Sequence, residues 1–141
     1  LKDLTMKNNQ SQSQKHQESP FKGKTGIRRL INAFGYSMDG FKAAYQHEDA
    51  FRQEVWLALL LIPLSLYLES AALERILMIG SVLLVMIVEL LNSAVEAVVD
   101  RVSIERHALA KRAKDIGSAA VLLALINLAI VWGLILFQST R

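Results

Sequence analysis

Three acidic side chains and one amide recur at helical spacing within an apolar part of the chain. The segment VELLNSAVEAVVD, residues 88–100, contains Glu89, Asn92, Glu96 and Asp100. A helix turns by about 100° per residue, so offsets of 3, 7 and 11 residues lie within about 60° of Glu89 on one helix face. Ionisable groups are costly inside a membrane helix and therefore indicate a functional site. We refer to these four residues as the acidic stripe.

Three functions are compatible with the acidic stripe. It could fix helix packing through hydrogen bonds, it could relay ions in a small cation or drug transporter, or it could act on a lipid headgroup. Packing alone does not require four aligned polar groups, three of them acidic. A transporter would carry charges along its whole path, whereas these crowd toward one half of the helix. Chemistry on a lipid headgroup is therefore the favoured interpretation.

The segment that follows the stripe favours phosphoryl transfer. It reads RVSIERHALAKRAKDIGS and places Lys114 and Asp115 where the next apolar run begins. Carboxylates bind Mg²⁺ together with phosphate oxygens, and a lysine supplies a positive charge for phosphate. Because phosphoryl transfer depends mostly on positioning and charge neutralisation, a metal ion, a cation and a base are sufficient for it.

Membrane helices must position these residues. The chain has 141 residues, of which 52% are hydrophobic and 21% are charged, and its apolar residues concentrate in three runs. We expect transmembrane helices over residues 51–69, 73–103 and 113–138, with a cytoplasmic loop over residues 104–112. Pro63 should kink the first helix.

Two further segments precede the first span. Residues 1–25 are polar and low in aromatic residues, which predicts a disordered tail. Residues 26–50 are amphipathic and predict a helix on the membrane surface, broken into two pieces by Gly35 and Gly40. A soluble helix packed on another element is the alternative. The predicted fold class is all-α integral membrane, with three transmembrane helices plus an N-terminal amphipathic surface helix.

The placement of basic residues predicts the partner and the orientation. The net charge is +3, and the basic residues flank the apolar runs, which favours a lipid bilayer rather than nucleic acid as the partner. Nine Lys and Arg residues lie at or before Arg52 and five lie from Arg101 to Lys114, whereas the first connection has only Arg75. The N-terminus and the second loop should therefore face the cytoplasm. There is no cysteine, which excludes thiolate metal sites.

Three motifs resemble the prokaryotic diacylglycerol kinases. They are FRQE at 51–54, ELLNSAVEAVVDR at 89–101 and RAKDIGSAAV at 112–121. The resemblance implies a small multi-pass enzyme of the bacterial cytoplasmic (inner) membrane, acting as a homotrimer with shared active sites. It would transfer the γ-phosphate of ATP, with Mg²⁺, to diacylglycerol and yield phosphatidic acid. Some members of the family phosphorylate undecaprenol, which stays open as the alternative lipid.

The resemblance also implies a role for each matching residue. Glu89 would be the base facing the lipid hydroxyl, and Glu48 and Glu96 would bind the metal ion. The residues expected to contact the nucleotide are Arg29, Tyr36, Glu48, Asn92, Glu96, Glu105, His107, Lys114 and Asp115. Those expected to line the lipid, besides Glu89, are Arg29, Ala33, Gly35, Ser37, Lys42, Ala43, Ala44, Ala50, Phe51, Arg52, Gln53, Glu54, Ser118 and Trp132.

Overall fold

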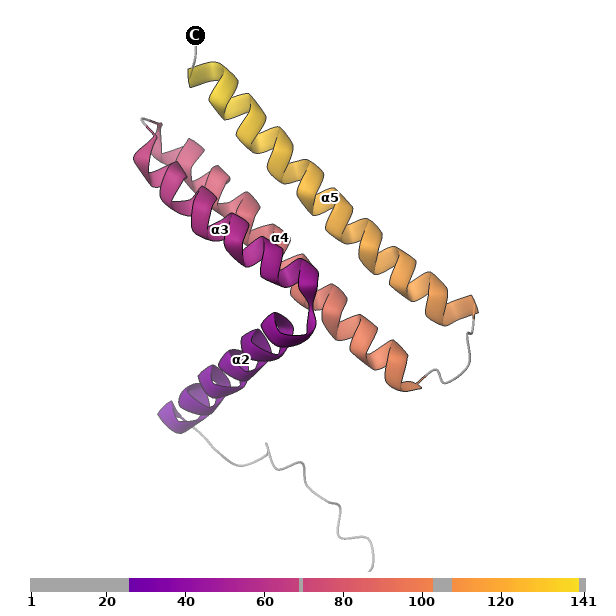
Figure 1. The fold of residues 1–141 in the computed structure, drawn as a ribbon. Coiled ribbons are helices and arrows are strands. Elements are labelled where there is room, and N and C mark those ends of the chain that lie inside the picture. Colours follow the sequence, from indigo (N-terminus) through magenta and orange to yellow (C-terminus); the bar gives the residue numbers. More distant parts are fainter. Residues whose placement is uncertain (1–25, 69, 103–107, 140–141) are drawn as a thin grey trace, which may run out of the picture. The chain divides into compact units, whose positions relative to one another are not determined.

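The computed structural model describes residues 26–68, 70–102 and 108–139 of the chain (Figure 1). All regular structure within these residues is helical. The helices are α2 (Ile27–His47), α3 (Asp49–Tyr67), α4 (Ala72–Val102) and α5 (Ala108–Ser139). The predicted all-α class is therefore confirmed. The polar tail expected over residues 1–25 lies outside the described residues.

Three of the helices are long and apolar enough to cross a membrane. The candidate spans are Asp49–Tyr67, Ala72–Arg101 and Ala108–Gln138. At a rise of 1.5 Å per residue, α3 is about 28 Å long and matches a hydrocarbon layer of about 30 Å. Helices α4 and α5 are about 46 and 48 Å long, which exceeds that thickness.

Helix α5 begins earlier than the expected start at residue 113, so Lys111 lies on a helix. The residues Ala108–Arg112 have high helix propensity, and Lys111 pairs with Asp115 one turn later, which supports the first turns. The charged residues Lys114 and Asp115 are consequently held on a regular helical surface.

Helix α2 is continuous, and the expected break at Gly35 and Gly40 is wrong. A glycine in a helix interior costs only about 1 kcal/mol relative to alanine, which is too little to end a helix with periodic apolar residues. Ile27, Leu30 and Phe34 are exposed in the structure. Their location at the membrane surface stays a prediction.

The chain divides after Met38 into two compact units, and α3, α4 and α5 belong to the second.

The junction between the last turns of α2 and the start of α3 is tied by side chains. The Arg52 guanidinium donates to the carbonyl oxygens of Tyr45 at 2.9 Å and Gln46 at 3.1 Å, and it also pairs with Asp49. The ring of Phe51 is 2% exposed and stacks on Phe41, with 6.4 Å between the ring centroids. These contacts fix the backbone on both sides of Glu48.

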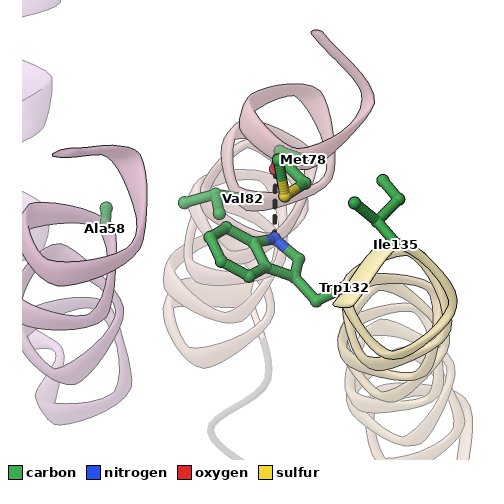
Figure 2. Close-up of a cluster of buried hydrophobic side chains, with 5 residues drawn as sticks. All are labelled: Ala58, Met78, Val82, Trp132 and Ile135. Atoms are coloured by element: carbon green, nitrogen blue, oxygen red, sulfur yellow. Dashed lines mark hydrogen bonds between the residues drawn. The ribbon is translucent and has the colours of Figure 1, made fainter. Parts of the chain in front are cut away.

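The core of the second unit joins all three spans. Helix α4 packs against both α3 and α5 (Figure 1). The cluster in Figure 2 consists of Ala58 from α3, Met78 and Val82 from α4, and Trp132 and Ile135 from α5.

A hydrogen bond fixes the register of α4 against α5 within this cluster. The indole N–H of Trp132 donates to the carbonyl oxygen of Met78 at 3.3 Å (Figure 2). The Ser81 hydroxyl donates to the same oxygen at 2.8 Å. Trp132 bonds to the carbonyl of one particular residue, so the two helices are aligned in one register. This register also sets which residues of α4 and α5 lie side by side at their polar ends.

Candidate active site

The acidic stripe lies on α4, where its spacing predicts it. Glu89 is 4% exposed, and the amide Nδ2 of Asn92 donates to Glu96 Oε1 at 3.3 Å. Glu96 is half-buried, whereas Asp100 is exposed, with 65% of its side-chain surface accessible. The stripe therefore runs from a buried carboxylate at Glu89 to an accessible one at Asp100.

Two further carboxylates approach Glu89 from the start of α3. Glu54 is 8% exposed, and its Oε2 atom is buried without a hydrogen-bond partner. The carboxylates of Glu48, Glu54 and Glu96 each lie near enough to that of Glu89 to repel it when both are charged. We call Glu48, Glu54, Glu89 and Glu96 the acidic cluster. Glu54 and Glu89 are both buried, and burying like charges together is unfavourable unless a proton or a cation offsets them.

The donor set of the cluster suits a magnesium ion. Glu48 is the N-cap residue of α3, yet its side chain makes no capping hydrogen bond. The Oδ1 atom of Asn92 is also buried without a partner. Mg²⁺ prefers oxygen ligands and is usually held by one or two carboxylates together with substrate phosphates. Among the described residues, no group of three or more His, Cys, Asp or Glu side chains is arranged to hold a metal ion by itself.

A lysine on α5 lies beside the acidic stripe. Lys114 Nζ is 2.6 Å from Asp100 Oδ1 and is also close enough to Glu96 for electrostatic attraction. Asp115, one residue further, accepts a hydrogen bond from Lys111 at 2.7 Å. The packing of α4 against α5 thus brings the positive charge of Lys114 to the acidic stripe. The spacing of residues along α4 does not predict this contact, because Lys114 lies on another helix.

Gly117 is a site residue that the sequence analysis missed. A Cβ atom at this position would overlap Asn92 Oδ1, whereas one at Gly80 or Gly133 would meet nothing within 4 Å. The sequence does contain one indication of its role, since an isolated glycine inside a strongly apolar helix is often required for close packing. Finding its partner required the register between α4 and α5.

The other predicted site residues divide by location. In the second unit, Ala44, Phe51, Glu54 and Trp132 are buried and Arg52 is half-buried, whereas Lys42, Ala43, Ala50, Gln53 and Ser118 are exposed. Phe51 and Trp132 both pack against other residues of the chain, so the expectation that they also contact the lipid substrate stays a prediction. The residues of the first unit are exposed, namely Arg29, Ala33, Gly35, Tyr36 and Ser37. Glu105 and His107 lie outside the described part of the chain.

Fold and site together define a small helical membrane protein with buried carboxylates at the packing surface of its spans. A family model described as prokaryotic diacylglycerol kinase matches residues 35–136. A diacylglycerol kinase of Pseudomonas aeruginosa is 57% identical over 118 residues, covering 84% of this chain and 96% of the relative. Another from Haemophilus influenzae is 58% identical over 113 residues, covering 80% and 96%. An Escherichia coli diacylglycerol kinase is 53% identical over 114 residues, covering 81% and 93%.

The chain therefore belongs to the prokaryotic diacylglycerol kinase family, and it is a bacterial membrane protein. The match includes all of the acidic cluster and Lys114, since both lie within residues 35–136.

Proposed function

We propose that this protein transfers the γ-phosphate of ATP to diacylglycerol and so produces phosphatidic acid at the cytoplasmic surface of the inner membrane. Family membership supports the reaction class, and the names of the relatives support the lipid. The observation that carries the proposal is the burial of Glu89 in a candidate membrane span, within electrostatic range of the other carboxylates of the acidic cluster.

Glu89 suits the role of general base. The primary hydroxyl of the lipid would give its proton to the Glu89 carboxylate while its oxygen forms a bond to the γ-phosphorus of ATP. The bond between that phosphorus and the oxygen bridging to the β-phosphate breaks, and ADP leaves. Glu89 is the deepest member of the acidic stripe, so it is the one placed to meet an alcohol that enters from the bilayer.

Glu48 and Glu96 would hold the magnesium ion. The ion, when bound with ATP, offsets the charge of the phosphates. Asn92 supports this pair, because its amide N–H holds Glu96 Oε1 at 3.3 Å while its own Oδ1 stays without a partner. Lys114 would exchange its contact with Asp100 for the phosphates, and Asp115 would contact the nucleotide. Arg29, Tyr36, Glu105 and His107 complete the expected nucleotide site.

We further propose a homotrimer with the N-terminus in the cytoplasm and with active sites shared between chains. Within one chain, only 17–28% of the most apolar window of each span is buried. Broad apolar surfaces are therefore left for lipid and for other copies of the chain. The density of Lys and Arg before Arg52 and between Arg101 and Lys114 supports the orientation.

The direct test is transfer of radiolabelled phosphate from ATP to diacylglycerol in mixed micelles. With magnesium present we expect labelled phosphatidic acid, and with a chelator in excess we expect none. An absence of labelled product with magnesium would refute the kinase assignment. Undecaprenol in a parallel reaction decides which lipid is preferred. Ion flux in proteoliposomes tests the transporter alternative, for which we expect a negative result.

A further inference from the structure

We propose that Gly117 on α5 is a positioning residue, which holds the Asn92 side chain in the orientation that supports Glu96. This inference rests on the proposed function, because it assigns Gly117 to the MgATP site through Asn92. Gly117 itself has no side chain to contact a nucleotide. Its contribution is the close approach of the α5 backbone to α4.

The geometry leaves no room for a side chain at this position. An ideal Cβ on Gly117 would overlap Asn92 Oδ1 and would lie 3.2 Å from Asn92 Cγ. The three atoms nearest to it all belong to the Asn92 side chain. The Asn92 amide therefore lies directly against the α5 backbone at Gly117.

The α5 backbone at Gly117 limits the orientation of the Asn92 side-chain amide. Asn92 Nδ2 donates to Glu96 Oε1 at 3.3 Å, one turn further along α4. A methyl group at position 117 would push on Oδ1, and the amide is the mobile end of its side chain, so it would rotate rather than displace a helix. Rotation removes the N–H donor from Glu96, and second-shell donors of this kind orient ligating carboxylates.

The first experiment compares Gly117→Ala with Gly133→Ala in the full-length kinase. Gly133 lies on the same helix, and a Cβ atom added there would meet nothing within 4 Å, so it is a matched control. We expect Gly117→Ala to raise the KM for MgATP by about tenfold or more, with the KM for diacylglycerol nearly unchanged. Gly133→Ala should change neither. Unchanged KM for MgATP in Gly117→Ala would overturn the proposal.

The second experiment repeats Gly117→Ala in an Asn92→Ala background. Alanine at position 92 removes the overlapping atoms, so the added methyl should have no further effect on MgATP affinity, measured by direct binding. In that background Gly117→Ala should also raise the unfolding temperature, because alanine favours a helix more than glycine does. An equal loss of MgATP affinity in both backgrounds would mean a general disruption of α5 and would overturn the proposal.

The two hypotheses fail in different ways. A wild-type protein without lipid kinase activity refutes the proposed function. A wild-type protein that is an active kinase but tolerates Gly117→Ala refutes only the role of Gly117. The unfolding temperatures of the four proteins in the cycle report the packing of position 117 against Asn92 in either case.

Discussion

Glu89 and Glu96 lie seven residues apart on α4, about 10 Å along the helix axis, and this separation should divide their tasks. We expect Glu89→Gln to abolish turnover while MgATP still binds with nearly unchanged affinity, because a base is lost and no metal ligand is. Glu96→Gln should weaken MgATP binding instead. Equilibrium binding of MgATP and the phosphoryl-transfer rate, measured on both variants, check this division.

The matched control is Glu74→Gln. Glu74 lies in the first turn of the same helix, where its carboxylate accepts the Ala71 N–H at 3.0 Å. Both turnover and MgATP affinity should survive this change. If Glu89→Gln loses nucleotide binding as severely as Glu96→Gln, then Glu89 is a ligand and the assignment as base is incorrect.

Lys114 gives a second prediction at the level of single residues. Lys114→Met should raise the KM for MgATP, because a positive charge for phosphate is removed. Asp100→Asn should have a much smaller effect, since it removes the present partner of Lys114 and leaves the lysine charge in place. Steady-state kinetics over a range of MgATP concentrations separate the two variants. Equal effects would indicate that the ion pair matters and the lysine charge does not.

Helical spacing alone predicts some of these residues and not others. Glu89, Asn92 and Glu96 follow from their offsets along one helix. The approach of Glu54 to Glu89 does not, because it depends on how α3 packs against α4. The contact of Gly117 with Asn92 likewise depends on the register of α5, which no pattern within a single helix encodes.

At the level of the helices, Trp132 links α5 to α4. Trp132→Phe should lower the free energy of unfolding by about 1 kcal/mol, because the hydrogen bond to the Met78 carbonyl is lost while most of the ring volume remains. Trp132→Ala should cost about 3–5 kcal/mol through the cavity it leaves. Reversible unfolding in mixed detergent measures both variants. Trp56→Phe is the control, since Trp56 is 65% exposed, and a comparable loss there would contradict the assignment.

The limits of the helices were only partly predictable. Apolar periodicity identifies the spans, because a helix in lipid must satisfy its own backbone and needs about 20 residues to cross. It does not predict that α2 continues through Gly35 and Gly40. It also does not predict that α5 begins at Ala108, where charged residues with high helix propensity extend the helix out of its apolar run.

At the level of the whole molecule, the arrangement of the acidic cluster sharpens the test for shared active sites. Glu48 and Glu89 lie within electrostatic range of each other in one chain, so we expect mixed trimers of Glu48→Gln and Glu89→Gln chains to recover little activity. Arg29 lies in the first unit, on the chain segment that ends at Met38. We expect Arg29→Ala and Glu89→Gln chains to complement each other if α2 serves a neighbouring copy.

Activity of the mixed samples, compared with each variant alone, checks this expectation. Tagged copies of each variant, purified in two steps, confirm that mixed assemblies have formed. Failure of the Arg29 and Glu89 pair to complement in such assemblies would place each site within a single chain. The sequence of one chain does not decide this, because helical spacing identifies apolar faces but does not distinguish those that meet lipid from those that meet another copy.

The packing of Trp132 also equips the protein with an optical probe. The chain has two tryptophans, and only Trp132 is enclosed in the core that joins α4 to α5, whereas Trp56 is exposed on α3. In a Trp56→Phe protein the remaining indole emits from one defined environment, bonded to a backbone carbonyl of the opposite helix. Its fluorescence spectrum should therefore change when α5 separates from α4, because the hydrogen bond to the Met78 carbonyl is then lost. The docking of these helices can then be followed in real time, independently of lipid turnover.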